Sequence, residues 1–106
     1  MSEMSEAYAE SDSARALFGI SVTAELVGTG VQNLRAYERR GLLEPRRTPG
    51  GTRLYSQDDL TRLRRITTLL ASGLNLAGVE AVLALEAENA VLRARLDRAQ
   101  RRGARG

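Results

Sequence analysis

The chain has 106 residues and a formal net charge of +3, and it contains neither cysteine nor histidine. A thiol nucleophile, an imidazole acid–base, a disulfide framework and the commonest metal ligands are therefore excluded. With one Phe, three Tyr and no Trp, the aromatic content is also low for a small-molecule pocket, so we expect no enzyme activity, no metal site and no cofactor.

Charge is distributed unevenly along the sequence, and all sixteen basic residues are arginine. Residues 35–65 hold nine arginines against four acidic residues, a local excess of five positive charges, whereas residues 1–18 are acidic. Because arginine forms forked bonds with phosphate, this pattern favours a polyanionic partner. The alternative explanation for the arginine content is a coding bias. The alternative explanation for the uneven charge is a solvated, salt-bridged surface. No run of 18 apolar residues is present, so no membrane partner is expected.

The N-terminal part is expected to be unstructured before a first short helix. Residues 1–18 are rich in Ser, Glu and Ala with little periodicity, which predicts a disordered acidic leader. Ser21 is the expected N-cap of a helix over Val22–Val27, and Gly28 is expected to end that helix.

A second helix is predicted from Val31 to Arg40, with Gly41 as its C′ residue. Leu34 and Tyr37 are three residues apart and lie on its inward-facing stripe. Two short helices joined by a glycine-containing turn predict a helix-turn-helix, although many helical hairpins share this pattern.

The segment Arg46–Ser56 contains a Gly-rich turn with basic neighbours, which could belong to a nucleotide cradle or to a β-hairpin. A phosphate-binding loop needs a Gly-x-x-x-x-Gly-Lys-Ser/Thr frame, and that frame is absent here. Pro49–Gly51 has the residues of a tight turn, and Thr52, Leu54 and Tyr55 suit a strand. The sequence therefore predicts a hairpin.

A third helix is predicted over residues 57–72, because Ser56 and Asp59 form a capping-box pattern at its start and Gly73 ends it. Its core stripe consists of apolar residues at helical spacing: Leu60, Leu63, Ile66, Leu69 and Leu70. The arginines expected on the opposite side form mainly a solvated surface: Arg62, Arg64 and Arg65.

Asn75 is expected to cap a final helix from Leu76 to about Arg102. This segment shows a 4-3 repeat whose a and d positions are Val82, Leu85, Asn89, Leu92, Leu96 and Ala99. The repeat predicts a dimerisation helix in a coiled coil, with packing on its own domain as the alternative. The sequence leaves open whether the helix is continuous.

Charges beside this repeat bear on the orientation of the two helices. Glu86 and Arg93 occupy e positions, and Glu88 and Arg95 occupy g positions. An antiparallel pair brings opposite charges together at both e–e′ and g–g′, so the charges favour an antiparallel coiled coil, by a small margin. Asn89 favours the other orientation, since a buried Asn at position a often fixes parallel pairing.

Two runs are specific in combination, namely Leu-Arg-x-Tyr-Glu-Arg-x-Gly-Leu at residues 34–42 and Gly-x-Arg-x-Tyr-Ser at residues 51–56. The sequence from 20 to 66 resembles the DNA-binding domain of MerR-type transcriptional regulators. The sequence from 73 to 86, GLNLAGVEAVLALE, looks more like one subgroup, the heat-shock repressor HspR.

The resemblance implies a mainly α fold in three parts after the leader. Residues 19–86 would form a winged helix-turn-helix DNA-binding domain whose wing is a small β-hairpin. Residues 87–102 would form a C-terminal coiled-coil dimerisation helix, and residues 103–106 a flexible tail.

The resemblance also implies partners. It implies a homodimer, joined by an antiparallel coiled coil, that binds an inverted-repeat operator in double-stranded DNA in the bacterial cytoplasm, at the nucleoid. For the HspR subgroup it implies repression of heat-shock and chaperone genes with the chaperone DnaK as co-repressor. The alternatives are a MerR-type regulator or architectural DNA binder outside the heat-shock response and, in a different class, a helical coiled-coil adaptor protein.

Candidate DNA contacts lie on the second helix, which the resemblance implies in the major groove, and on the wing. Gln32 is expected to contact a base and Arg35 a phosphate more than a base, while Tyr37 is expected mainly in the core. The full set of candidates is Thr23, Gln32, Asn33, Arg35, Tyr37, Arg39, Arg46, Arg47, Arg53 and Tyr55. Of these, Arg53 and Tyr55 are the expected main phosphate ligands, and for each arginine the alternative is a surface salt bridge.

The second helix departs from the pattern of MerR-type proteins at three positions. Gly30 replaces a polar N-cap, which weakens the cap by at most a few tenths of a kcal/mol. Asn33 stands where relatives usually have Thr, and Ala36 stands where many have Tyr, so a contact from that Tyr is missing.

Overall fold

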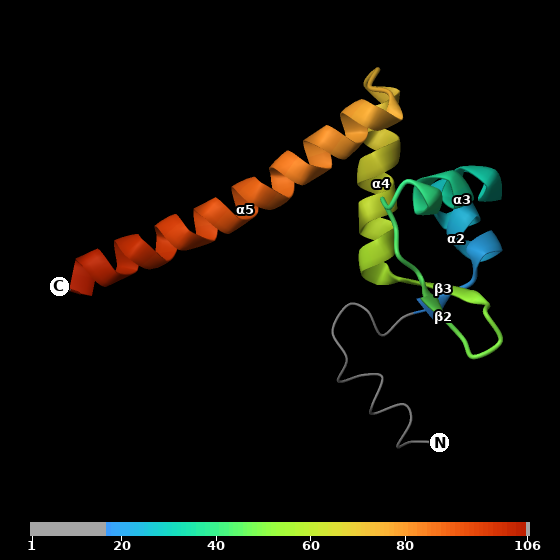
Figure 1. The fold of residues 1–106 in the computed structure, drawn as a ribbon, viewed down its shortest axis with the longest axis horizontal. Helices are drawn as coiled ribbons and strands as arrows, with labels where there is room; N and C mark the ends of the chain where they lie inside the picture. The colour runs from blue at the N-terminus through green and yellow to red at the C-terminus, as the bar shows by residue number, and fades with distance from the viewer. Residues whose placement is uncertain (1–16, 106) are drawn as a thin grey trace. The chain divides into compact units, whose positions relative to one another are not determined.

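The structure is a computed structural model that describes residues 17–105, so the first sixteen residues of the leader predicted over residues 1–18 lie outside the described part, as does Gly106. The described chain divides into two compact units at Thr68 and Leu69. Its elements in chain order are β1 (Leu17–Phe18), α2 (Ile20–Val27), α3 (Val31–Arg39), β2 (Arg46–Arg47), β3 (Arg53–Ser56), α4 (Gln57–Ala71) and α5 (Leu76–Arg105) (Figure 1).

Helix α2 begins one residue before the predicted cap. Its N-cap is Gly19 and no side chain caps it, so the prediction of Ser21 as N-cap was wrong. The hydroxyl of Thr23 donates a hydrogen bond to the Gly19 carbonyl oxygen at 2.7 Å. The predicted end of the helix is confirmed, because Gly28 has a φ of 80°, a conformation that glycine adopts without steric cost.

Helix α3 is confirmed, with Leu34 and Tyr37 buried on its inner side. It ends at Arg39, one residue earlier than predicted, and Arg40 is its C-cap. The next residue, Gly41, has a φ of 77°, and the Leu42 N–H donates to the Tyr37 carbonyl oxygen at 2.9 Å, as expected for a glycine at C′. Gly30 is the N-cap and provides no side-chain bond.

The three strands form an antiparallel sheet in the order β1-β3-β2. In one ladder Arg46 pairs with Leu54 and Arg47 with Arg53, which confirms the predicted hairpin. The other ladder pairs residues 17 and 18 with 56 and 55. The prediction that these two residues belong to a disordered leader was therefore wrong, since they add a strand to the wing.

The hairpin loop closes through a tight turn at Thr48. The Gly51 N–H donates to the Thr48 carbonyl oxygen at 2.8 Å, and the Thr48 N–H donates to the Thr52 carbonyl oxygen at 2.9 Å. Gly51 has a φ of +88°, the left-handed residue that ends a common three-residue hairpin loop. The glycines thus serve the turn, as the sequence predicted.

Helix α4 begins with the predicted reciprocal capping box. The Asp59 N–H donates to Ser56 Oγ at 3.1 Å, and the Ser56 N–H donates to Asp59 Oδ2 at 2.8 Å. Arg62 was expected to be mainly a solvated surface residue, but its Nε donates to the Leu42 carbonyl oxygen at 2.6 Å. This bond ties the connector between α3 and the wing, residues 40–45, to α4.

The core of the first unit lies between the helix-turn-helix, the connector, β3 and α4. Its buried apolar side chains are Ala24, Leu34, Tyr37, Leu42, Leu43, Tyr55, Leu60, Leu63 and Ile66. The three members from α4 belong to its predicted core stripe.

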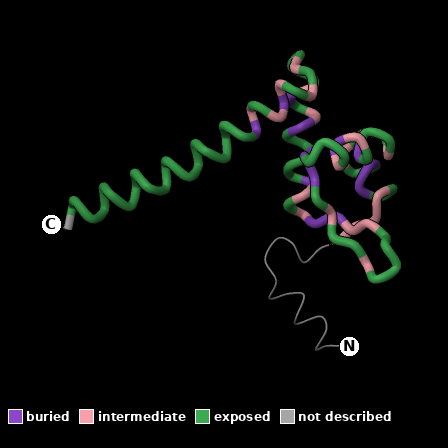
Figure 2. The backbone as a smooth tube through the Cα atoms, viewed as in Figure 1, coloured by how far each residue is buried: buried purple, intermediate pink, exposed green. Residues whose placement is uncertain are grey.

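Helix α5 is continuous over 30 residues, or roughly 45 Å at 1.5 Å per residue. Its predicted cap is confirmed, because Asn75 Oδ1 accepts a bond from the Gly78 N–H at 2.8 Å. Residues 103–105 continue the helix, so the predicted flexible tail was wrong for those residues. From residue 84 through residue 104 every residue is exposed (Figure 2). Within residues 17–105, no helix has both the length and the apolar content needed to cross a membrane.

Candidate nucleic-acid interface

The outer face of α3 is built by residues three, four and seven positions apart, which share one side of a helix. These are Gln32, Arg35, Ala36 and Arg39. The three long polar side chains are exposed, while Leu34 and Tyr37 anchor the opposite side in the core. The helix therefore presents an amide and two guanidinium groups outward from a fixed base.

Asn33 and Tyr37 lie elsewhere on α3. Asn33 is exposed, and its Nδ2 donates to Thr29 Oγ1 at 2.9 Å, so its amide ties the helix to the preceding turn. Tyr37 exposes only 4% of its surface, as the expectation of a core position required.

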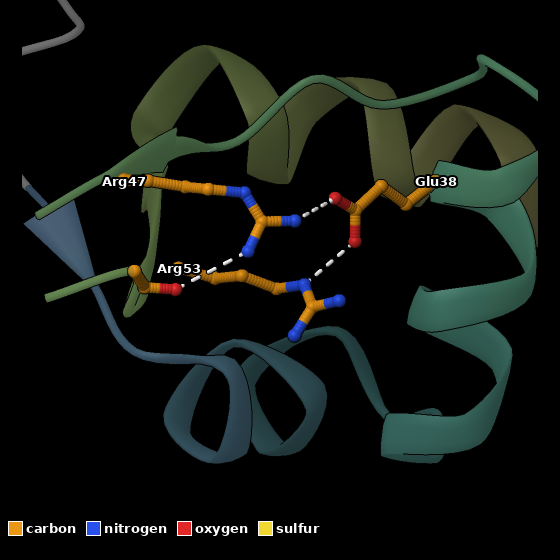
Figure 3. A network of polar contacts seen from close by, with 4 residues as sticks. Glu38, Arg47 and Arg53 are labelled. Carbon is orange, nitrogen blue, oxygen red and sulfur yellow. Dashed lines mark hydrogen bonds and ion pairs between the residues drawn. The ribbon is translucent and has the colours of Figure 1, made fainter.

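Glu38 joins α3 to both strands of the hairpin. Its Oε1 accepts a hydrogen bond from Arg53 Nε at 2.6 Å, and its Oε2 forms an ion pair with Arg47 Nη2 (Figure 3). Arg47 Nη1 also donates to the Gly51 carbonyl oxygen at 3.2 Å. Both arginines are thus held in the salt-bridge arrangement that the sequence left open as the alternative.

The charges in this network support one another. Burial by itself would raise the pKa of Glu38, but the hydrogen bond and charge of Arg53, with the charge of Arg47, outweigh it and the pKa lies below its usual value. The bond to Glu38 in turn raises the pKa of Arg53. The carboxylate is therefore ionised at neutral pH.

Arg53 and Tyr55 lie on the same face of the hairpin, because residues two apart on a strand share a face. Tyr55 is fully buried, so this face is turned inward. Its hydroxyl has no hydrogen-bonding partner among the described residues, and burial, with the charge of Glu38, raises its pKa, so it stays protonated. The expectation that Tyr55 meets a phosphate does not fit this geometry.

Thr23 does not fit its expected role either. The residue is fully buried, and its hydroxyl is committed to the Gly19 carbonyl oxygen. A phosphate outside the fold has no access to that oxygen, so the contribution of Thr23 is to hold the start of α2.

Arg46 lies on the opposite face of the hairpin from its neighbour Arg47 because side chains alternate along a strand. It is exposed, and within residues 17–105 it forms no ion pair. Its guanidinium is therefore open to a ligand, whereas those of Arg47 and Arg53 are partly engaged by Glu38.

The predicted heptad seam of α5 is exposed along most of its length. Leu85, Leu92 and Leu96 expose 63%, 60% and 58% of their surfaces, whereas Val82 is half-buried. Asn89 and Ala99 are also exposed. Such a row of leucines on one side of a charged helix is typical of a surface that another helix covers.

Asn89 has a partner within its own helix, because its Oδ1 accepts a bond from Arg93 Nε at 2.9 Å. The bond uses one acceptor site of the amide, which can still donate through Nδ2, so it favours neither orientation of the pair.

Sequence reasoning assigned no role to Glu38. The residue stands inside the Tyr-Glu-Arg part of the run at residues 34–42, but its partners follow nine and fifteen positions later. A single acidic residue among the arginines of this helix was the available signal. Within residues 17–105, no group of three or more acidic residues could hold a metal ion.

The helix-turn-helix, the hairpin and the start of α5 together coincide with a known family. Residues 18–86 match the model of the MerR HTH family of regulatory proteins. The chain belongs to the MerR family.

Individual MerR-family proteins are similar to this chain to different degrees. The putative heat shock protein HspR of Streptomyces coelicolor is 44% identical over 80 residues, which cover 74% of this chain and 53% of that protein. The HTH-type transcriptional regulator GlnR of Bacillus anthracis is 39% identical over 70 residues, covering 66% and 54%. The chain thus spans about half the length of these curated relatives.

A solved structure of the family shares the fold. It is HiNmlR, a MerR family regulator lacking the sensor domain and bound to promoter DNA. The match has a TM-score of 0.61 with 26% identity, and it covers 73% of this chain and 56% of that one.

Proposed function

We propose that this MerR-family chain is a sequence-specific DNA-binding transcriptional regulator that reads bases with α3. The observation that carries this proposal is the exposed row of Gln32, Arg35 and Arg39 on a helix whose other side is fixed in the core. Gln pairs with adenine and Arg with guanine or phosphate in the major groove. The DNA-bound state of the related HiNmlR supports the same use of the fold.

The wing would hold the flanking DNA backbone through arginine. Arg46 is exposed and would bind a phosphate directly. Arg53 uses Nε for Glu38, and since a guanidinium has five N–H donors, four remain for a phosphate. Arg47 bonds with two of its nitrogens, so we assign it a supporting role.

The active form would be a homodimer joined by an antiparallel coiled coil of α5. The exposed leucines supply the apolar seam, and the opposite charges at e–e′ and g–g′ favour this orientation. A twofold dimer presents two copies of α3, which matches an inverted-repeat operator.

Heat-shock and chaperone genes are the targets we favour, with the protein acting as a repressor in the bacterial cytoplasm and the chaperone DnaK as co-repressor. The 44% identity to the putative HspR supports this choice. A MerR-type regulator outside the heat-shock response is the second candidate, because the identity to GlnR is 39% over a similar stretch.

Two measurements test these proposals in order. A gel-shift titration against a competitor duplex tests sequence-specific binding, and binding without sequence preference at every salt concentration would instead favour the helical adaptor. Genome-wide footprinting then tests the targets. Sites upstream of chaperone genes would support the heat-shock role, and sites elsewhere would favour the second candidate.

A further inference from the structure

Glu38 fixes the wing relative to the helix that carries Gln32. The carboxylate belongs to α3, exposes only 19% of its side chain, and contacts Arg53 of β3 and Arg47 of β2 at once (Figure 3). Each contact uses a different carboxylate oxygen. A shift of the hairpin against α3 would therefore break at least one charge-assisted bond.

The position of an acid here has a cost for DNA binding. A carboxylate beside the wing repels phosphate, and it occupies N–H donors that a phosphate would otherwise accept from. If affinity alone were favoured, a neutral side chain would serve better at this position. An acid that restrains two arginines instead limits the ways in which the wing can bind a DNA backbone.

We propose that Glu38 is a positioning residue for sequence selectivity, holding Arg47 and Arg53 against α3 and withholding them from the phosphates of non-matching DNA. On the operator, the wing and α3 contact DNA together in the geometry that Glu38 sets. On other sequences the base contacts are lost, and the restrained arginines cannot move to replace them with additional phosphate contacts. This inference rests on the proposed DNA-binding function.

The test compares Glu38→Gln with a matched control, Glu44→Gln. Both variants remove one negative charge, but Glu44 is exposed and forms no ion pair within residues 17–105. Two probes are used, namely a duplex selected from a random library by the wild-type protein and a scrambled duplex of equal length. Binding of each is measured over a series of salt concentrations.

In the E38Q variant, the released arginines should bind one more phosphate of the scrambled duplex. The slope of log K against log salt should steepen by about 0.9, since each phosphate contact contributes that amount. The ratio of selected to scrambled affinity should fall about ten-fold, which is comparable with the loss caused by one mismatched base pair. The E44Q variant should keep the wild-type ratio.

A second variant, Glu38→Asp, separates position from charge and serves if E38Q does not fold. Aspartate keeps the charge but is one methylene shorter, so it cannot hold both arginines in place. Its ratio of selected to scrambled affinity should fall as in E38Q, and its salt slope with scrambled DNA should steepen in the same direction, because an arginine that it no longer holds is free to bind a phosphate. Equal ratios for E38Q and E44Q, or an equal loss on both duplexes, would overturn the inference. Failure of the wild type to select any sequence would instead contradict the proposed function.

Discussion

Arg47 lies directly opposite Arg53 in the antiparallel ladder of the wing, and one carboxylate, that of Glu38, contacts both guanidinium groups. Like charges at opposed positions of a ladder destabilise a hairpin. The acid from α3 removes this repulsion by accepting a bond from each arginine. The hairpin is therefore held in place by a residue outside the sheet.

This arrangement predicts a pH dependence of stability. The pKa of Glu38 in the folded protein lies below its usual value, so its ionised form stabilises the fold above the usual pKa. This contribution is lost as the pH falls through the folded pKa. The thermal midpoint of the wild type should thus exceed that of E38Q at neutral pH, and the gap should narrow as the pH falls below the usual value of 4.5 and through the lowered folded pKa. Thermal melts followed by circular dichroism check this, and a constant gap down to pH 3 would contradict it.

Arg46 and Arg47 are neighbours in sequence and point to opposite faces, which gives a matched pair of variants. We expect Arg46→Ala to weaken binding to all sequences about equally and to flatten the salt slope by about 0.9, because an exposed guanidinium is lost. Arg47→Ala should change the slope less, since that arginine already bonds Glu38 and the Gly51 carbonyl. Fluorescence anisotropy over a salt series measures both. Equal slopes for the two variants would show that the faces do not differ in DNA contact.

Tyr55→Phe removes a buried hydroxyl that has no partner among the described residues. An unsatisfied buried polar group destabilises the folded state. The free energy of unfolding of the variant should therefore equal that of the wild type or exceed it by about 1 kcal/mol. DNA affinity should stay at the wild-type value, because the side chain is fully buried. Urea unfolding and a gel-shift titration supply the two measurements. A ten-fold or greater loss of DNA affinity, with an unchanged free energy of unfolding, would show that the Tyr55 hydroxyl does contact a phosphate.

Leu92 and Val91 are adjacent, exposed residues of α5 that differ in their place on the heptad. Leu92 exposes 60% and sits at position d, whereas Val91 exposes 51% and sits at position c, outside the seam. A charge buried in a coiled-coil seam is strongly unfavourable, so Leu92→Glu should yield monomers and lose operator binding. Val91→Glu should remain dimeric.

Sedimentation equilibrium at several protein concentrations distinguishes these states. A dimeric Leu92→Glu variant would show that the seam lies elsewhere on α5. Dissociation of both variants would show that the interface is wider than the a and d positions. Leu96→Glu repeats the test one turn further along the helix.

The elements that the sequence predicted correctly are those with local signals. Gly28, Gly41 and Gly73 end helices, and Ser56 and Asp59 cap α4 because a cap needs only residues three positions apart. The outer face of α3 likewise follows from helical spacing. Ser21 failed as a cap because Gly19 starts α2 earlier, and strand β1 carried no pattern of its own since it is only two residues long.

By itself the sequence determined the helices, the hairpin with its turn at Pro49–Gly51, the row of side chains on α3 and the leucine repeat of α5, all of which follow from spacing along the chain. Strand alternation also placed Arg53 and Tyr55 on one face. Only the tertiary structure decided that this face turns toward α3, burying Tyr55 and pairing Arg53 with Glu38. The physical reason is that a strand pattern of period two defines two faces without saying which is inside, and contacts fifteen residues apart settle that question.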